Sequence, residues 1–211
     1  MAPVTSYRTI ARDVSVDIEV KRSVFRCQLR RITDEAQARA VVDSARAEYW
    51  DARHHCSAFI WLPDGSLARS SDDGEPSGTA GAPMLEVLRG AGLTEVVAVV
   101  SRWFGGTLLG AGGLVRAYSD SVRTAVQTAG LLQRHLVTEQ EVHLGHDIAA
   151  RVESSLRSHG VVVLDASHGS EVALRLGVRP DETDHVAALL AEVTQGSSTM
   201  TEVGERWVDV G

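Results

Sequence analysis

A buried strand that runs into a glycine-rich loop constrains this chain more than any other feature. Residues 96–100 are all apolar, and residues 105–113 contain five glycines in nine positions. Glycine adopts positive φ easily and lets a second backbone or a ligand come close, but it costs conformational entropy on folding. We therefore expect the loop either to shape a binding surface or to form a tight crossover against a sheet. A helix should begin near Leu114 and end at Gly130.

The distribution of charge divides the chain into two parts. Residues 1–135 carry 16 basic and 15 acidic side chains, a net charge of +1, whereas residues 136–211 carry 5 basic and 13 acidic side chains, a net charge of −8. We predict one domain over residues 1–134 and a second over residues 135–211, since a chain of 211 residues can hold two small domains. Contacts with phosphates supply most non-specific affinity for nucleic acids, so any such role should fall on the first part.

Composition and cysteine content favour a cytoplasmic protein. No apolar run approaches the length of a membrane span, and the first residues lack the basic flank and apolar core of a secretory signal. Cys27 and Cys56 lie on apolar strands, which is typical of small buried side chains rather than of a disulfide. The alternative is a catalytic thiol at Cys56, beside His54 and His55, which would require an exposed electropositive setting.

Hydrophobic periodicity in the first part predicts strands mixed with helices. Asp34 is placed to cap a helix, and Gln37 occupies the reciprocal position of a capping box. Pro83 suits the first turn of a second helix. The expected elements are strands over residues 9–30, 54–62 and 67–69, helices after Asp34 and Pro83, and a polar loop over residues 70–81.

The second part repeats a simple order of elements. Alternating or continuous apolar segments predict four strands, and two helical stripes lie between them. The expected strands cover residues 137–144, 161–164, 171–178 and 200–210, and the helices cover residues 148–160 and residues 181 or 183 to 193. The order βαββαβ is that of the ferredoxin-like plait, so the fold class that we predict is α+β.

The polar loop carries three carboxylates within four residues, at Asp72, Asp73 and Glu75. Oxygen ligands of this kind can hold a hard divalent cation, but the alternating spacing of a calcium loop is absent. We favour the alternative, an acidic turn or a helix cap. Small residues that follow, including Ser77 and Thr79, can expose backbone N–H groups to an anion.

Two arginines, Arg102 and Arg116, bracket the glycine loop. Guanidinium groups beside bare backbone amides and a helix N-terminus suit a phosphate or a carboxylate. The structural alternative is that they pair with the carboxylates of the polar loop. The loop matches neither GxGxxG nor GxxxxGK[ST], and no nucleophile elbow, zinc pair or catalytic triad is present. We predict no metal and no cofactor.

The adjacent histidines His54 and His55 fall on an expected strand. Neighbouring residues of a strand point to opposite faces, so at most one of the two rings can face a site. We favour packed or hydrogen-bonded rings over a metal pair, and we keep His54 as a secondary candidate for binding.

Two motifs resemble those of the IMPACT family, of the bacterial YigZ type. Residues 71–81 read SDDGEPSGTAG and residues 104–118 read FGGTLLGAGGLVRAY. Segments 19–25 and 51–58 are also similar to the family, so the resemblance covers residues 15–130. The sequence departs from the family pattern at His55 and Trp103, where asparagine and tyrosine are common.

The resemblance implies a fold more than a reaction. It implies an N-terminal βα domain like one in a ribosomal protein and like domain four of elongation factor G, and a C-terminal domain like domain five of that factor. Eukaryotic members restrain a starvation response of translation initiation and carry an additional N-terminal domain. This chain has no room for that domain, so we do not expect the same partner.

These observations favour a binding or regulatory protein of translation over an enzyme. The expected partner is RNA, the ribosome or a translation-related protein, with no membrane and no sequence-specific reading of DNA. The alternative is an enzyme or a small-anion binder that uses the glycine-rich region. Seven residues should line a shared polar cleft: Asp72, Glu75, Thr79, Arg102, Gly105, Gly106 and Arg116. The wider set of candidate binding residues adds Asp73, Ser77, Gly112 and Gly113.

Overall fold

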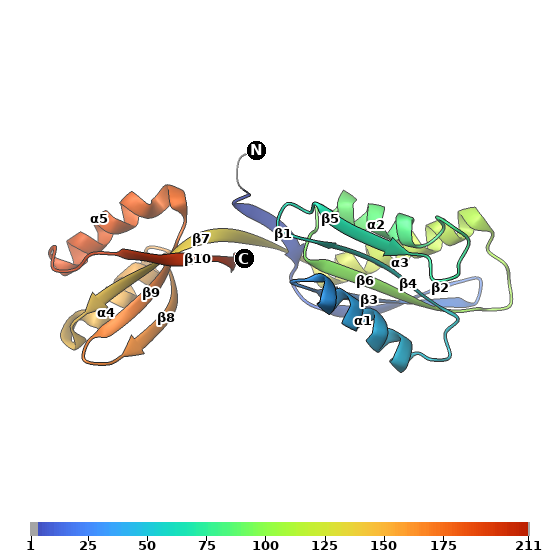
Figure 1. Cartoon of the computed structure of the whole chain (residues 1–211), viewed down its shortest axis with the longest axis horizontal. Helices are drawn as coiled ribbons and strands as arrows, with labels where there is room; N and C mark the ends of the chain where they lie inside the picture. Colours follow the sequence, from blue (N-terminus) through green and yellow to red (C-terminus); the bar gives the residue numbers. More distant parts are fainter. Residues whose placement is uncertain (1–3, 211) are drawn as a thin grey trace. The chain divides into compact units, whose positions relative to one another are not determined.

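The computed structural model describes residues 4–210 and divides the chain into two compact units (Figure 1). The larger unit comprises Ser6–Gln133. The smaller unit comprises Arg134–Val210 together with Val4 and Thr5. Each unit has its own hydrophobic core, so each is described by itself. The chain as a whole is an α+β protein, which confirms the predicted class.

A five-stranded antiparallel sheet forms the centre of the larger unit. Its strands are β2 (Val14–Val20), β3 (Ser23–Arg31), β6 (Val96–Trp103), β4 (His54–Trp61) and β5 (Leu67–Ser71), in that spatial order. The predicted strand over residues 9–30 is wrong in one respect, because it spans three strands, β1 (Ser6–Ile10), β2 and β3. Lys21 and Arg22 turn the chain between β2 and β3 with φ of 49° and 66°. Glycine or asparagine usually marks such a turn, so the sequence carried no signal for it.

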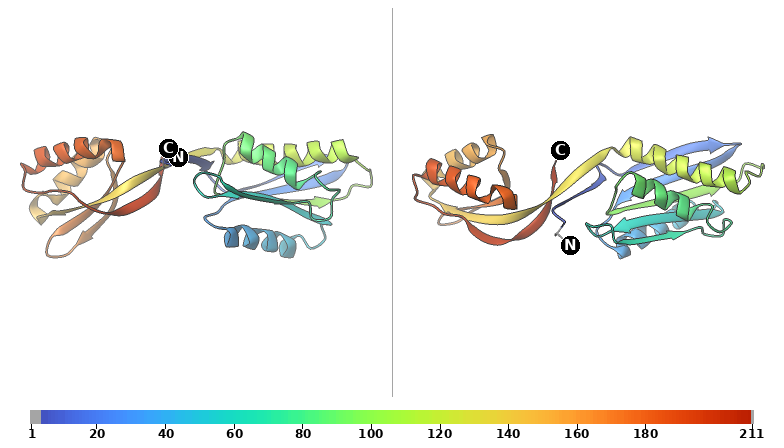
Figure 2. Two further views of the ribbon diagram at one scale, coloured as in Figure 1. Left: turned by 45° about the horizontal axis from the view of Figure 1, so that its top comes forward. Right: turned by 90° about the horizontal axis from the view of Figure 1, so that it is seen from above.

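Helices cover both faces of this sheet, as Figure 2 shows. Helix α1 (Glu35–Glu48) lies on one face, and helices α2 (Gly81–Gly90) and α3 (Ala111–Ala129) lie on the other. Successive residues of a strand point to opposite faces, so β6 supplies both cores. Val97 and Val99 pack on the α1 side, whereas Ala98 and Val100 pack on the side of α2 and α3. This position explains why β6 is apolar without alternation.

Asp34 caps helix α1 as the sequence predicts, but the reciprocal hydrogen bond of Gln37 reaches Thr33, the residue before the cap. The backbone N–H of Gln37 donates to Oδ1 of Asp34 at 2.8 Å, and Oε1 of Gln37 accepts from the N–H of Thr33 at 3.0 Å. Helix α3 ends at Ala129, and the predicted stop residue Gly130 is its C-cap with φ of 71°. It begins three residues before the predicted Leu114, because Gly112 and Gly113 belong to its first turn.

The smaller unit is a ferredoxin-like plait. Its elements are β7 (Leu131–Leu144), α4 (His146–Ser158), β8 (Val162–His168), β9 (Val172–Val178), a 3₁₀ turn (Pro180–Glu182), α5 (Thr183–Thr194) and β10 (Thr201–Val210). Strand β9 lies between β7 and β8, and β10 pairs with β7. The order β10-β7-β9-β8 confirms the predicted plait. Its core joins both helices to the sheet through residues such as Val152, Leu174 and Leu190.

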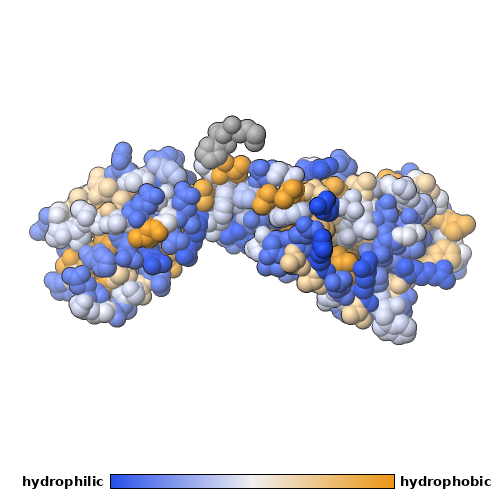
Figure 3. All heavy atoms as spheres, in the orientation of Figure 1, coloured by the Kyte–Doolittle hydropathy of each residue, from blue (hydrophilic) through white to orange (hydrophobic). Residues whose placement is uncertain are grey.

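The surface is mostly hydrophilic, with small separate apolar patches on the face drawn in Figure 3. Within residues 4–210, no helix has the length and apolar content needed to cross a membrane.

Candidate functional site

The two glycine-rich motifs meet at the end of β6 through a buried ion pair. Nη1 of Arg102 donates to Oε1 of Glu75 at 2.6 Å, and the hydroxyl of Tyr118 on α3 donates to the same oxygen at 2.8 Å. The side chains of Arg102 and Glu75 are 8% and 3% exposed. The polar loop, β6 and α3 are therefore joined by one buried polar cluster. The sequence left two alternatives for Arg102, a ligand anion or a carboxylate of the polar loop. In the structure Arg102 pairs with the carboxylate.

Aromatic rings enclose this cluster. The guanidinium carbon of Arg102 lies 5.4 Å from the ring centre of Phe25 and 5.9 Å from that of Phe104. Burial raises the pKa of Tyr118, and the neighbouring Cys56 and Glu75 add to this effect. Burial likewise raises the pKa of the Cys56 thiol to about 12. This thiol stays protonated at neutral pH, which argues against a catalytic role.

Asp72 holds the polar loop against the start of α2. Its carboxylate accepts the backbone N–H groups of Gly78 at 2.8 Å, Ala80 at 3.0 Å and Gly81 at 2.8 Å. Burial by itself would raise the pKa of Asp72, but these three hydrogen bonds outweigh it and keep the pKa below its usual value. The carboxylate acts as the helix cap that the sequence allowed.

Asp73 and the two histidines also have partners within the protein. Oδ1 of Asp73 pairs with Arg46 at 2.8 Å, and Oδ2 accepts the N–H of His55 at 2.6 Å. Nδ1 of His54 donates to the carbonyl oxygen of Asp73 at 2.8 Å, and Nδ1 of His55 hydrogen-bonds the hydroxyl of Ser101 at 2.9 Å. Burial lowers the pKa of His55. Among residues 4–210, no group of three His, Cys, Asp or Glu side chains is placed to hold a metal ion.

The glycines of the loop are not all needed for the same structural reason. A Cβ atom on Gly105 would lie 2.0 Å from the carbonyl carbon of Arg22, and the N–H of Gly105 donates to the hydroxyl of Ser23 at 3.0 Å. This glycine is needed for packing against the β2–β3 turn. Gly106 has φ of 84°, and a Cβ on Gly112 would meet no atom within 4 Å. Close packing therefore accounts for Gly105 and leaves Gly112 unexplained.

The remaining predicted residues form no hydrogen bond with Glu75, Arg102 or Tyr118. The hydroxyl of the buried Thr79 donates to the carbonyl oxygen of Pro76 at 2.6 Å, and Ser77 is exposed in the same loop. Gly113 lies in the first turn of α3. Arg116 is exposed on α3 and forms no ion pair within the described part of the chain. Ligand binding by the predicted set stays a prediction.

A small open pocket borders the buried cluster. It has a volume of about 250 Å³, and we call it the Phe104 pocket; its lining residues are Arg53, His54, Arg102, Phe104 and Leu108. The guanidinium carbon of Arg53 lies 5.8 Å from the centre of the Phe104 ring. Phe104 is 41% exposed and Leu108 is 84% exposed. The exposed Arg53 forms no ion pair with the described residues.

Sequence reasoning missed three residues of this pocket, namely Arg53, Phe104 and Leu108. One signal could have found Phe104. Phe104 follows the last residue of a strand and opens a glycine-rich loop. A large apolar residue in such a position has few neighbours to bury it. An exposed aromatic ring is a common feature of recognition surfaces.

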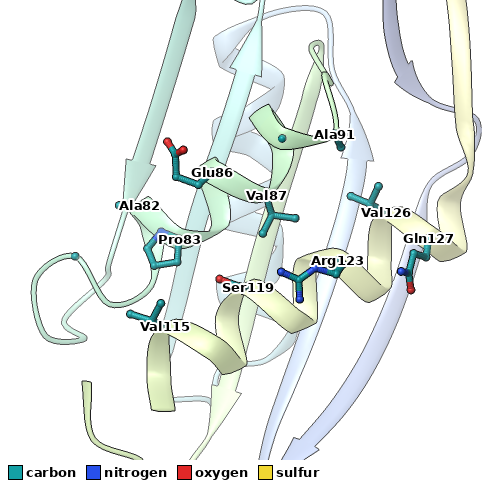
Figure 4. Close-up of a pocket in the computed structure, with 12 residues that line it drawn as sticks. Ala82, Pro83, Glu86, Val87, Ala91, Val115, Ser119, Arg123, Val126 and Gln127 are labelled. Atoms are coloured by element: carbon teal, nitrogen blue, oxygen red, sulfur yellow. The ribbon is translucent and has the colours of Figure 1, made fainter. Parts of the chain in front are cut away.

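A larger groove lies between α2 and α3 (Figure 4). It has a volume of about 750 Å³, and its walls include Pro83, Val87, Val115 and Val126. Glu86 is the one carboxylate that lines the groove, and it pairs with Arg89 of its own helix at 3.1 Å. The groove is mainly apolar and shows no arrangement of groups suited to a reaction.

Comparison with known proteins shows which protein family this chain resembles. The model of the Impact N-terminal domain matches residues 21–126, and that of a domain of unknown function, DUF1949, matches residues 142–197. The IMPACT family member YvyE of Bacillus subtilis is 34% identical over 93% of this chain and 91% of its own length. The IMPACT family member YigZ of Escherichia coli is 36% identical over 92% of this chain and 97% of its own length.

A solved structure agrees with these relatives. The crystal structure of a hypothetical protein is 36% identical, with a TM-score of 0.63, and the match covers 94% of this chain and 98% of that one. The chain therefore belongs to the IMPACT family, which confirms the resemblance seen in the two motifs.

The buried ion pair predicts strong coupling between its two residues. Arg102→Met leaves the Glu75 carboxylate buried without its cation and should lower the free energy of unfolding by about 3–5 kcal/mol. The double variant Arg102→Met/Glu75→Gln keeps a hydrogen-bond acceptor for Tyr118 and should recover most of this loss. Urea unfolding of the wild type, the single variants Arg102→Met and Glu75→Gln, and the double variant measures the coupling. Additive losses in the double variant would contradict it.

Two glycines of the loop should respond oppositely to alanine. Gly105→Ala places its Cβ against the backbone of Arg22, and we expect a loss at the upper end of the about 1–3 kcal/mol typical of overpacking. Gly112→Ala lies in open space within a helix and should raise stability by about 0.5–1 kcal/mol. Thermal and urea unfolding test both variants. Equal effects would show that packing does not distinguish the two positions.

The buried His55 predicts a loss of stability in mild acid. Because its pKa is lower in the folded protein, its stabilising effect is complete above the unfolded pKa of about 6.5 and declines as pH falls toward the folded pKa. His55→Gln removes the titrating group and keeps a hydrogen-bonding amide. Its melting temperature should therefore fall less than that of the wild type between pH 7.5 and 5.5. Parallel curves over this range would contradict the prediction.

Proposed function

We propose that this chain is a non-catalytic binding protein of translation whose larger unit contacts RNA. The observation that carries the proposal is the unpaired, exposed Arg53 beside the half-exposed ring of Phe104. Arginine binds phosphates, and aromatic rings and guanidinium planes stack on bases. RNA presents both phosphates and unstacked bases, so it can use both groups together.

Further basic residues support this proposal. Lys21 and Arg22 are exposed at the turn that packs against Gly105, and Nη2 of Arg22 donates to the hydroxyl of Thr107 at 3.3 Å. The glycine loop thus lies between Arg53 on one side and Lys21 and Arg22 on the other. Two carboxylates of the polar loop are already paired, Glu75 with Arg102 and Asp73 with Arg46. The exposed Asp51 and Glu19 lie near Arg53 and Lys21 in the chain and oppose part of the basic charge.

The chemistry of the site supports binding over catalysis. A general acid or base must be free to exchange a proton with a substrate. Here Glu75 is shared by Arg102 and Tyr118, and the Cys56 thiol is held protonated by burial. The link to translation rests on the resemblance of the two domains to those of a ribosomal protein and of elongation factor G, which supports the proposal by analogy of fold.

A second candidate function is binding of a small phosphate compound in the Phe104 pocket. The volume of about 250 Å³ and the exposed guanidinium group of Arg53 favour it. A nucleotide that binds saturably while RNA does not bind would support this alternative.

Fluorescence anisotropy with a labelled RNA hairpin tests the proposal. The hairpin should bind more weakly as salt is raised, because phosphate contacts release counterions. Arg22→Ala/Arg53→Ala should bind more weakly at every salt concentration and should reduce the log–log salt slope by about one for each lost contact. The control Arg89→Ala/Arg123→Ala removes the same charge from exposed positions of α2 and α3. Equal binding by both double variants would overturn the proposal.

A further inference from the structure

We infer, on the basis of the proposed RNA contact, that the Phe104 pocket takes an unpaired nucleobase and that the larger unit selects single-stranded over double-stranded RNA. The inference goes beyond the proposed function by naming the form of RNA and the residue that distinguishes it.

The first step concerns the ring of Phe104. It directly follows the last residue of β6 and is 41% exposed, whereas Phe25 of the neighbouring strand is fully buried. Packing of the core therefore does not account for an aromatic residue at this position. Stacking of a base on an aromatic side chain contributes about 1–3 kcal/mol, and it tolerates any sequence because every base has a π face.

The second step concerns the groups around the ring. The guanidinium carbons of Arg53 and Arg102 lie 5.8 Å and 5.9 Å from its centre. Arg102 is fixed by Glu75, but Arg53 is exposed and free of ion pairs in the described chain. A base can extend this stack on the plane of Arg53, or displace that side chain and lie on Phe104. In the second case Arg53 remains close enough to meet the adjoining phosphate.

The third step concerns size. A volume of about 250 Å³ is below the roughly 300–1,000 Å³ of sites for drug-sized ligands, so it suits one ring system rather than a folded oligonucleotide. Bases of a duplex are stacked on each other and do not enter such a pocket. A single strand can place one base in the pocket while its phosphates lie near Lys21 and Arg22.

A second exposed ring lies close in the chain. Trp50 follows the end of α1 and is 83% exposed. It precedes Arg53 by three residues, a span of at most about 11 Å. A strand of several nucleotides that occupies the Phe104 pocket can therefore reach a second aromatic surface.

The experiment compares one labelled unstructured 12-nucleotide RNA with the same strand annealed to its complement. Anisotropy at physiological salt should show tighter binding of the single strand. Phe104→Leu keeps an apolar side chain but removes the π face, and we expect it to weaken binding of the single strand about 5- to 100-fold. Phe104→Tyr should retain binding. Leu62→Ala, at another partly exposed apolar position, is the matched control.

The outcomes separate this inference from the function on which it rests. No binding of either RNA would overturn the proposed function. Equal binding of both RNAs, with no effect of Phe104→Leu, would overturn the inference and leave the proposed function standing. Adenosine monophosphate should compete weakly, since it offers one phosphate. Binding of this nucleotide as tight as that of the 12-nucleotide strand would also overturn the inference, in favour of a small-molecule site.

Discussion

The buried contact of Glu75 with Arg102 and Tyr118 is the interaction on which the larger unit depends. A charge taken out of water is costly unless a partner of opposite charge and hydrogen bonds compensate it. Here one carboxylate oxygen accepts both donors, so the polar loop, the central strand and α3 are fixed to one another. The same contact places the Arg102 guanidinium beneath the Phe104 ring, and the exposed surface of the site is built on it.

The central strand β6 connects this cluster to the rest of the fold. Its side chains reach both hydrophobic cores, which holds its end in a defined position. The glycine loop starts at the end of β6 and passes close to the β2–β3 turn. Because Gly105 has no side chain, its backbone can lie against the backbone of Arg22. Several features that resemble a binding loop therefore serve packing. A loop on a rigid strand is also a common position for recognition residues, and Arg53 and Phe104 lie on connections of this kind.

The polar groups of the site separate into two kinds. Carboxylates, histidines and the Cys56 thiol are occupied by partners within the protein or are held protonated by burial. Arg53, Phe104 and the basic turn at Lys21 are exposed. Groups of the first kind stabilise the structure, and groups of the second kind are accessible to a ligand. This separation is the physical reason for proposing recognition rather than chemistry.

The sequence by itself determined most of the elements, the plait and the family, because hydrophobic periods, caps and motifs are local properties. It did not mark the turn at Lys21 and Arg22, which divides the strand predicted over residues 9–30. Asp34 and Gln37 marked a helix start, and the order βαββαβ marked the smaller unit. Only the tertiary structure decided which partner each polar residue takes and which rings stay exposed. The pairing of Glu75 with Arg102 joins positions 27 residues apart, and the surface around Phe104 combines two separate segments, residues 53–54 and 102–108. Such contacts follow from strand order and packing, which no local pattern encodes.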